Sequence, residues 1–307
     1  MNIMMNKLAR FLPKGRAWVT AVPYTWMLLF FLIPFFFVLK ISFAEVDISQ
    51  PPYTDLVTRT EDLLQIHLNL GKYIAIFSDG WMGQYIVAYG TSLKMAFYTT
   101  VFTLLIGYPM AYHIARAKEA TRNTLLMLVM LPFWTSFLLR VYAWIGILKD
   151  NGVLNNLLMS LHIINEPIEM LYTPFSIMVG MVYSYLPFMI LPLYSHLVKL
   201  DGRLLEAAGD LGAKPWRTFL SITLPLSKGG IIAGSMMVFI PAVGEYVIPE
   251  LLGGGDALMI GKKLMDDFGP NLDWPMASAV AVVMIMLLII PIIWFHRFET
   301  REMKGNE

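Results

Sequence analysis

The sequence predicts an all-α membrane protein that crosses the bilayer six times. Of its 307 residues, 57% are hydrophobic and only 15% are charged, whereas a soluble globular chain is about one quarter charged. Six apolar segments are long enough to cross a hydrocarbon core, where a segment can satisfy its own backbone hydrogen bonds only as a helix. The predicted spans are residues 22–41, 90–115, 124–148, 175–197, 231–249 and 277–295.

The first span follows a basic N-terminal tail, residues 1–21, and resembles a signal peptide at first sight. Its apolar run from Val22 to Ile41 is about 20 residues long, which is the length of a full span. No small-x-small cleavage site follows this run. We therefore expect an uncleaved first transmembrane helix.

The later spans complete a single transmembrane domain, residues 22–295, followed by a C-terminal tail, residues 296–307. Spans three and five are less regular, because polar residues and prolines interrupt them. Short helices outside the spans are expected near residues 153–161 and 259–268. No internal repeat or soluble domain is evident.

Basic residues are concentrated in alternate loops, which sets the orientation under the positive-inside rule. They occur in the N-terminal tail, after span two, in the loop 198–230 after span four, and in the C-terminal tail. Both termini are therefore predicted to be cytoplasmic, as an even number of spans requires. These residues are Lys7, Arg10, Lys14, Arg16, Arg116, Lys118, Arg122, Lys199, Arg203, Lys214, Arg217, Lys228, Arg297, Arg301 and Lys304.

The first outer loop, residues 42–89, is predicted to be periplasmic and is rich in acidic residues. Within it, Ile66, Leu68 and Leu70 alternate with polar residues, which permits a short strand. Its acidity follows from the exclusion of basic residues from this side, and steering of a cationic ligand is the alternative interpretation. The acidic residues are Glu45, Asp47, Asp55, Glu61, Asp62 and Asp79.

Several classes of function find no support in the sequence. A chain without cysteine has no disulfide, thiolate metal site or cysteine nucleophile, and a net charge of +1 does not indicate a nucleic-acid partner. The five histidines show no metal-ligand spacing, and no convergent set of catalytic groups indicates an enzyme. A Walker A loop is also missing, because Asp256 and Lys263 stand where that motif needs glycine and Ser/Thr around Gly261-Lys262.

The loop 198–230 contains the pattern with the clearest physical mechanism. Asp201 is suited to cap a helix through its carboxylate, and Gly212 can end that helix in the left-handed conformation. Pro215 suits the first turn of a second short helix. One helix face carries Leu204, Ala207, Ala208 and Leu211, and the other carries Arg203, Glu206 and Asp210 at spacings that let them pair. The pattern predicts an exposed helix–turn–helix, and an ordinary amphipathic loop helix is the simpler alternative.

The complete spacing resembles the EAA signature of binding-protein-dependent ABC importer permeases. The loop reads Glu-Ala-Ala from Glu206, then three residues, Gly212, nine residues, and Ile-x-Leu-Pro ending at Pro225. The resemblance implies a six-helix type I ABC importer permease fold, whose short cytoplasmic coupling helices contact an ATPase subunit. The residues assigned to this coupling are Asp201, Glu206, Ala207, Ala208, Asp210, Gly212, Ile222 and Pro225.

The same resemblance implies the partners of such a permease in a bacterial inner membrane. These are a second, homologous permease subunit, a cytoplasmic ATPase dimer and a periplasmic binding protein. The chain itself needs no cofactor, because ATP and Mg would be bound by the ATPase.

Further stretches resemble polyamine importer permeases, most closely the putrescine type. They begin at Pro132, Arg140, Asn151 and Pro241, and the first outer loop adds Pro51-Pro52-Tyr53-Thr54 and Leu68-Asn69-Leu70-Gly71. The resemblance implies a polyamine as substrate and a polyamine-binding protein in the periplasm. Permeases for spermidine, iron, thiosulfate or opines share parts of this pattern and remain alternatives.

Two charged residues lie within or beside apolar spans, Arg140 in span three and Glu245 in span five. Such a charge normally faces protein or water and has a partner. A polyamine pathway would need carboxylates and aromatic faces for cation–π contact. Alternatively, Glu245 forms a salt bridge with Arg140 and the aromatic residues form an interfacial belt. The candidate pathway residues are Glu245, Tyr246, Arg140, Trp134, Tyr142 and Trp144.

Overall fold

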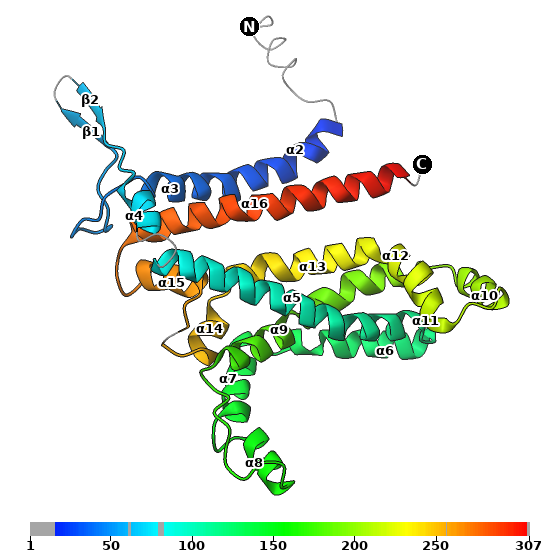
Figure 1. Ribbon diagram of the computed structural model, residues 1–307. Coiled ribbons are helices and arrows are strands. Elements are labelled where there is room, and N and C mark those ends of the chain that lie inside the picture. Colours follow the sequence, from blue (N-terminus) through cyan, green and yellow to red (C-terminus); the bar gives the residue numbers. More distant parts are fainter. Residues whose placement is uncertain (1–15, 61–62, 79–82, 256, 306–307) are drawn as a thin grey trace, which may run out of the picture. The chain divides into compact units, whose positions relative to one another are not determined.

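The structure, a computed structural model, is almost entirely helical (Figure 1). It describes residues 16–60, 63–78, 83–255 and 257–305. The helical class predicted from the sequence is confirmed, and within the described ranges one two-stranded hairpin is the exception. The chain divides into two compact units, which consist of residues 1–75 with 267–283 and residues 76–266 with 284–307.

The first unit begins with a helical run that contains the first predicted span. This run is assembled from α2 (Arg16–Met27), the π-helical turn η1 (Leu28–Leu32) and α3 (Ile33–Ile41). A hairpin of antiparallel strands follows, β1 (Val57–Thr60) and β2 (Leu63–Ile66).

The sequence predicts a strand near residues 66–70, which is too far along the chain. Strand β2 ends at Ile66, and the backbone N–H of Asn69 instead donates to the Phe43 carbonyl at 2.9 Å. Periodicity alone did not show that these residues return the chain to the end of α3.

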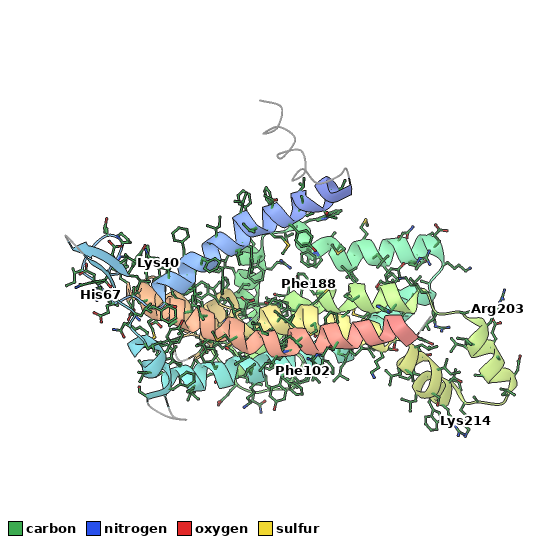
Figure 2. All side chains as sticks on the ribbon, turned by 90° about the horizontal axis from the view of Figure 1, so that it is seen from above. Lys40, His67, Phe102, Phe188, Arg203 and Lys214 are labelled. Atoms are coloured by element: carbon green, nitrogen blue, oxygen red, sulfur yellow. The ribbon has the colours of Figure 1, made fainter. Side chains whose placement is uncertain are left out.

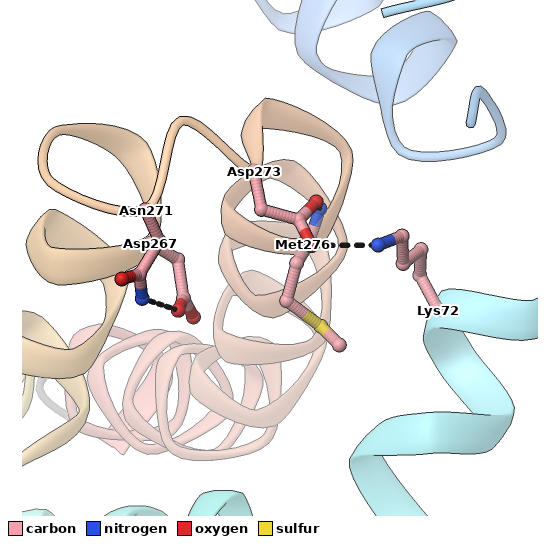
Figure 3. A network of polar contacts seen from close by, with 5 residues as sticks. All are labelled: Lys72, Asp267, Asn271, Asp273 and Met276. Atoms are coloured by element: carbon pink, nitrogen blue, oxygen red, sulfur yellow. Dashed lines mark hydrogen bonds and ion pairs between the residues drawn. The ribbon is translucent and has the colours of Figure 1, made fainter. Parts of the chain in front are cut away.

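A polar network joins the two chain segments of the first unit (Figure 3). Lys72 lies on α4 (Gly71–Ser78), and its Nζ is 2.6 Å from Oδ2 of Asp273, which precedes α16 (Trp274–Gly305). The other carboxylate oxygen of Asp273 accepts the Met276 backbone N–H at 2.9 Å, which caps α16. A nearby hydrogen bond joins Asn271 Nδ2 to Asp267 Oδ1 at 3.0 Å.

The second unit is built on three helices that pack along one another (Figure 1). They are α5 (Gln84–Arg116), α9 (Pro174–Leu197) and α13 (Lys228–Val243). Met189 of α9 is fully buried, and a Cβ on Gly234 of α13 would lie 2.8 Å from its sulfur. On the other side, a Cβ on Gly107 of α5 would lie 3.2 Å from Met189 Cγ. Glycine thus lets these helices approach closely, as is common in membrane helix bundles.

Neither the third nor the fifth predicted span is one continuous helix. Helix α6 (Glu119–Met130) and the 3-10 turn η3 (Leu131–Trp134) are followed by extended backbone at Thr135, and α7 (Phe137–Leu148) then begins. The bend there is 91°. Pro132 has no backbone N–H to donate, which weakens the helix at this point. In the fifth span α13 ends at Val243, and a separate helix α14 (Val247–Leu252) follows.

Three helical segments in the described part of the chain are long and apolar enough to cross a membrane. Two bent pairs raise this number to five if each counts as one span. Helix α5 is 33 residues long but does not meet the same criterion, although the sequence predicts a span there. Its buried face includes the polar residues Ser92, Thr99 and Thr103, which lower its mean hydropathy. The membrane boundaries of the six spans stay predictions.

The two short helices expected outside the spans are confirmed as helices. They are α8 (Val153–Ser160) and α15 (Ile260–Phe268). Asn155 of α8 is buried, and its side chain exchanges hydrogen bonds with the backbone of Ile168 at 2.9 and 3.0 Å. Some predicted charged positions lie outside the described residues, namely Lys7, Arg10, Lys14, Glu61, Asp62, Asp79 and Asp256.

Candidate functional site

The first helix of the predicted coupling loop begins where the sequence indicates. Helix α10 covers Arg203–Asp210. The carboxylate of Asp201 accepts the backbone N–H of Arg203 at 3.0 Å. That amide has no acceptor within the helix, so the carboxylate satisfies a donor that would otherwise need water. The N-cap position is Gly202, one residue later than predicted, and Asp201 makes the predicted bond to a first-turn amide from the position before it.

A tight turn then reverses the chain. Gly212 has a φ of +79°, the left-handed region that disfavours any residue with a side chain. The N–H of Ala213 donates to the Ala208 carbonyl at 2.9 Å, and α11 (Pro215–Thr218) starts on a proline. The predicted helix–turn–helix is confirmed, and residues 201–218 are named the coupling hairpin for their predicted role. Figure 2 shows Arg203 and Lys214 on it, at one end of the helices of the second unit.

The coupling hairpin exposes apolar side chains. Leu204, Leu211 and Trp216 are 47%, 89% and 64% exposed, although leucine and tryptophan usually lie in a protein interior. Ala207 between them is exposed as well, whereas Ala208 is only 9% exposed. An exposed apolar surface with small side chains is suited to close contact with another protein.

The predicted pairing among the charged residues of α10 is wrong. Arg203, Glu206 and Asp210 are all exposed, and the described part of the chain contains no ion pair among them. Fully solvated pairs of this spacing contribute little, so nothing holds the long side chains together. Their charges stay available at the surface of the hairpin.

An aromatic contact anchors the chain after the coupling hairpin to α5. The chain continues through the π-helical turn η4 (Phe219–Thr223) and α12 (Leu224–Leu226) into α13. The ring of Phe219 packs edge-on against Tyr108 and Tyr112, with centroid distances of 5.5 and 6.2 Å. The Tyr108 hydroxyl and Ser227 Oγ are 2.7 Å apart. Of the remaining coupling residues, Ile222 is half-buried and Pro225 is exposed.

The second candidate region lies at the opposite end of these helices, where α13 and α14 are separated by Gly244, Glu245 and Tyr246 (Figure 1). The Glu245 carboxylate turns toward α14. Its Oε1 accepts the backbone N–H groups of Val247 at 3.1 Å and Ile248 at 3.4 Å. A negative charge is favoured at this helix end by the unpaired amides and the helix dipole.

The other oxygen of the same carboxylate is held by α9. The Tyr185 hydroxyl donates to Glu245 Oε2 at 2.5 Å. Tyr185 is 8% exposed, whereas Glu245 is half-buried. The carboxylate therefore connects α14 to α9 through a residue that lies 60 positions earlier in the sequence.

The far end of α14 is attached to the start of the same helix, α9. The Leu252 carbonyl accepts the Tyr172 backbone N–H at 2.9 Å and the Ser176 hydroxyl at 2.7 Å. Lys262 of α15 adds an ion pair to Glu250 at 3.3 Å and a hydrogen bond to the Gly254 carbonyl at 2.7 Å. We name residues 244–254, with the partners that hold them, the α14 junction.

The salt bridge considered between Arg140 and Glu245 is absent from the structure. Arg140 instead lies over the rings of Phe133 and Phe137, with its Cζ 5.8 and 5.6 Å from their centroids. Its Nε is buried without a hydrogen-bond partner. Sequence spacing could not show that Glu245 is satisfied by Tyr185 and by its own helix.

The aromatic candidates are not gathered around Glu245 by any contact that the structure records. Trp134 and Tyr142 are 75% and 54% exposed, as belt residues would be. Trp144 packs edge-on against Tyr183 of α9 at 5.5 Å. Tyr246 is half-buried and directly precedes α14. Their placement in a substrate pathway stays a prediction.

Sequence reasoning missed the residues that fix the α14 junction, above all Tyr185, Ser176 and Lys262. A tyrosine or serine within an apolar span is a weak signal, because either residue also occurs on lipid-facing or packed surfaces. The broken helix itself was the usable signal, since the amides freed beside Pro241 and Gly244 require acceptors. Within the described residues, no group of three or more His, Asp or Glu side chains could hold a metal ion.

The sequence of the chain is similar to those of transport proteins. A family model described as "Binding-protein-dependent transport system inner membrane component" matches residues 103–304. The chain is 36% identical over 297 residues to the spermidine/putrescine transport system permease protein PotB of Haemophilus influenzae, covering 97% of this chain and 96% of that protein. It is 42% identical over 205 residues to PotB of Salmonella typhimurium, covering 66% of this chain and 71% of that relative.

A solved structure shares the fold. It is the crystal structure of a bacterial ABC transporter involved in the import of the acidic polysaccharide alginate, with a TM-score of 0.65. The match covers 97% of this chain and 98% of the other, at 17% sequence identity. The predicted ABC importer permease fold is thereby confirmed.

Proposed function

The chain belongs to the family of binding-protein-dependent transport system inner membrane components, and on that premise we propose that it forms the transmembrane pathway of an ABC importer for polyamines. As a member of that family it is a multi-pass inner-membrane permease and a transporter subunit, not an enzyme. One observation carries the proposal. Helix α13 leads from the exposed coupling hairpin to a carboxylate just beyond its far end, where Tyr185 in the middle of α9 holds it.

The coupling hairpin is the proposed contact with a cytoplasmic ATPase dimer, which binds ATP and Mg. Its exposed leucines and tryptophan provide apolar contact area, and Ala207 lets a partner surface approach the backbone. Glu206 and Asp210 would meet basic groups of the ATPase. The left-handed turn at Gly212 fixes the angle between the two short helices.

The polyamine assignment is supported by two relatives whose printed names include spermidine and putrescine. Within the chain, Glu245 offers a half-buried carboxylate that would meet one ammonium group of the substrate. We propose putrescine as the principal substrate, with spermidine as the nearest alternative. A periplasmic polyamine-binding protein would deliver it, and a second, homologous permease would complete the pathway.

Uptake tests the substrate and the coupling together. The chain is produced with its partner subunits in cells that lack other polyamine importers, and uptake of labelled putrescine is measured against competing spermidine. Glu206→Lys should reduce ATPase recruitment and uptake, because it reverses a charge on the docking surface. Glu119→Lys, an exposed carboxylate on α6 outside the hairpin, is the matched control. Putrescine and spermidine uptake no higher than in cells without the complex would refute the substrate assignment.

Orientation has its own test. We propose that both termini and residues 198–230 face the cytoplasm and that residues 42–89 face the periplasm. The chain contains no cysteine, so single cysteines can be placed at Ser49 and Ser221, which are both exposed. An impermeant thiol reagent added to intact cells should label the variant at Ser49 only. Labelling at Ser221 without labelling at Ser49 would reverse the proposed topology.

A further inference from the structure

The two oxygens of the Glu245 carboxylate have partners of different kinds. Oε1 accepts N–H groups of α14, which follows Glu245 directly in the chain. Oε2 accepts only the Tyr185 hydroxyl among the contacts recorded for it, and that donor comes from another helix. The first contact belongs to the local fold of the helix end. The second can be exchanged for another donor without unfolding α14.

An ammonium group of a polyamine is a suitable replacement for the hydroxyl. Both groups donate a charge-assisted hydrogen bond to the carboxylate oxygen, because the acceptor is ionised in both cases. The ammonium adds the Coulomb attraction of its own positive charge, which the neutral hydroxyl lacks. The displaced Tyr185 would also leave an aromatic face beside the cation. Its ring already lies 6.1 Å from that of Phe188, which keeps it within an aromatic cluster.

The exchange would affect the two helices that precede and follow the coupling hairpin in the chain. Helix α9 enters the coupling loop after Leu197, and α13 leaves it at Lys228. The Tyr185–Glu245 hydrogen bond joins the middle of α9 to the residues just beyond the far end of α13. Between this bond and the coupling loop the two helices pack tightly, since a Cβ on Gly234 would lie 2.8 Å from Met189 Sδ. Tight packing transmits a displacement along the helices because such interfaces deform little.

We propose that Tyr185 is a positioning residue that occupies, in the empty permease, the place on Glu245 that a substrate ammonium takes during transport. This inference rests on the proposed function, since it requires a cationic substrate and an ATPase at the hairpin. Substrate binding then breaks the contact between the middle of α9 and Glu245, while the bonds of Tyr172 and Ser176 to Leu252 remain, and the coupling hairpin transmits the change to the ATPase. A ligand can shift such an equilibrium only through its different affinity for the two states, and competition for Oε2 supplies that difference.

The test uses the complete complex, reconstituted with its partner permease, ATPase and binding protein in lipid vesicles. ATP hydrolysis is measured with the binding protein empty and with it loaded with putrescine. Tyr185→Phe removes the hydroxyl, so hydrolysis without substrate should rise by about tenfold, the effect of losing one hydrogen bond to a charged group. Tyr183→Phe is the matched control on the same helix, because its ring packs against Trp144 and the structure records no hydrogen bond for its hydroxyl.

A second variant acts in the opposite direction. Tyr185→Lys tethers an ammonium to α9 at the same oxygen, so it should keep hydrolysis low, prevent stimulation by putrescine and abolish uptake. Its result decides the matter if Tyr185→Phe does not assemble. Stimulation of either assembled variant by the wild-type factor overturns the role of Tyr185. A wild-type complex that neither putrescine nor spermidine stimulates overturns the proposed function itself, and the inference with it.

Discussion

The coupling hairpin and the α14 junction both depend on satisfied helix ends, but they are stabilised over very different distances in the chain. In the hairpin the cap, the turn and the second helix lie within residues 201–218, and contacts between neighbours close it. At the junction, α14 is held by Tyr185, Ser176 and Lys262, which come from two other helices. The hairpin can therefore keep its shape at an exposed surface, whereas the junction exists only inside the folded bundle.

This difference fits the proposed roles. A surface that docks another protein benefits from a rigid local motif that does not change as the helices move. A junction that responds to substrate benefits from contacts between separate helices, because those contacts can break one at a time. The following substitutions test the comparison, in order of decreasing expected effect.

Gly234→Val should have the largest effect, because it acts on the packing that both regions share. Even a Cβ at this position would lie 2.8 Å from Met189 Sδ and 3.1 Å from the Met189 carbonyl oxygen. Overpacking of this kind typically costs about 1–3 kcal/mol, so the yield of assembled complex should fall markedly. Gly90→Val on α5 is the control, since a Cβ there has open space. Equal yields of the two variants would show that the close approach of α9 and α13 is not required.

Gly212→Val should disrupt the hairpin alone. Its φ of +79° is strained for a β-branched residue, at a cost of about 1–3 kcal/mol. Because this cost is local, we expect normal membrane insertion but reduced co-purification of the ATPase. Gly202→Ala, at a φ of −60° with open space around it, should leave recruitment unchanged. Loss of membrane insertion in Gly212→Val would contradict the local character of the hairpin.

Ser176→Ala should weaken the junction more mildly. It removes the hydroxyl that donates to the Leu252 carbonyl at 2.7 Å and takes part in the capping box at the start of α9. Loss of a hydrogen bond of this kind costs about 1 kcal/mol, so the complex should unfold at a lower concentration of denaturing detergent. Ser195→Ala, whose exposed hydroxyl bonds only within its own helix turn, provides the comparison. ATPase recruitment should be normal in both variants.

The smallest expected effect is the interaction between Arg140→Gln and Glu245→Gln, which should be close to zero. The two side chains form no ion pair, so their effects on assembly should add to within about 0.5 kcal/mol, as for independent sites. Assembly of the single variants and the double variant is compared in one cycle. Restoration of assembly in the double variant would mean that the two charges pair after all, against the structure.

The sequence alone determined the helical membrane class, the family and the shape of the coupling hairpin. It could do so because each depends on local chemistry: apolar length, a capping carboxylate at Asp201, a glycine required at Gly212 and a proline tolerated at Pro215. The two short helices outside the spans were also evident from local pattern. Distant residues are not needed to read any of these features.

Only the tertiary structure decided how the irregular spans break and what their freed backbone groups contact. The sequence left a substrate cation and Arg140 open as partners of Glu245. In the structure the carboxylate contacts Tyr185 and the amides of α14, and it does not pair with Arg140. The physical reason is that a buried acceptor takes whichever donor the packing of other helices brings to it. That packing is set by α9, α13 and α14 together, and no local pattern in any one of them encodes it.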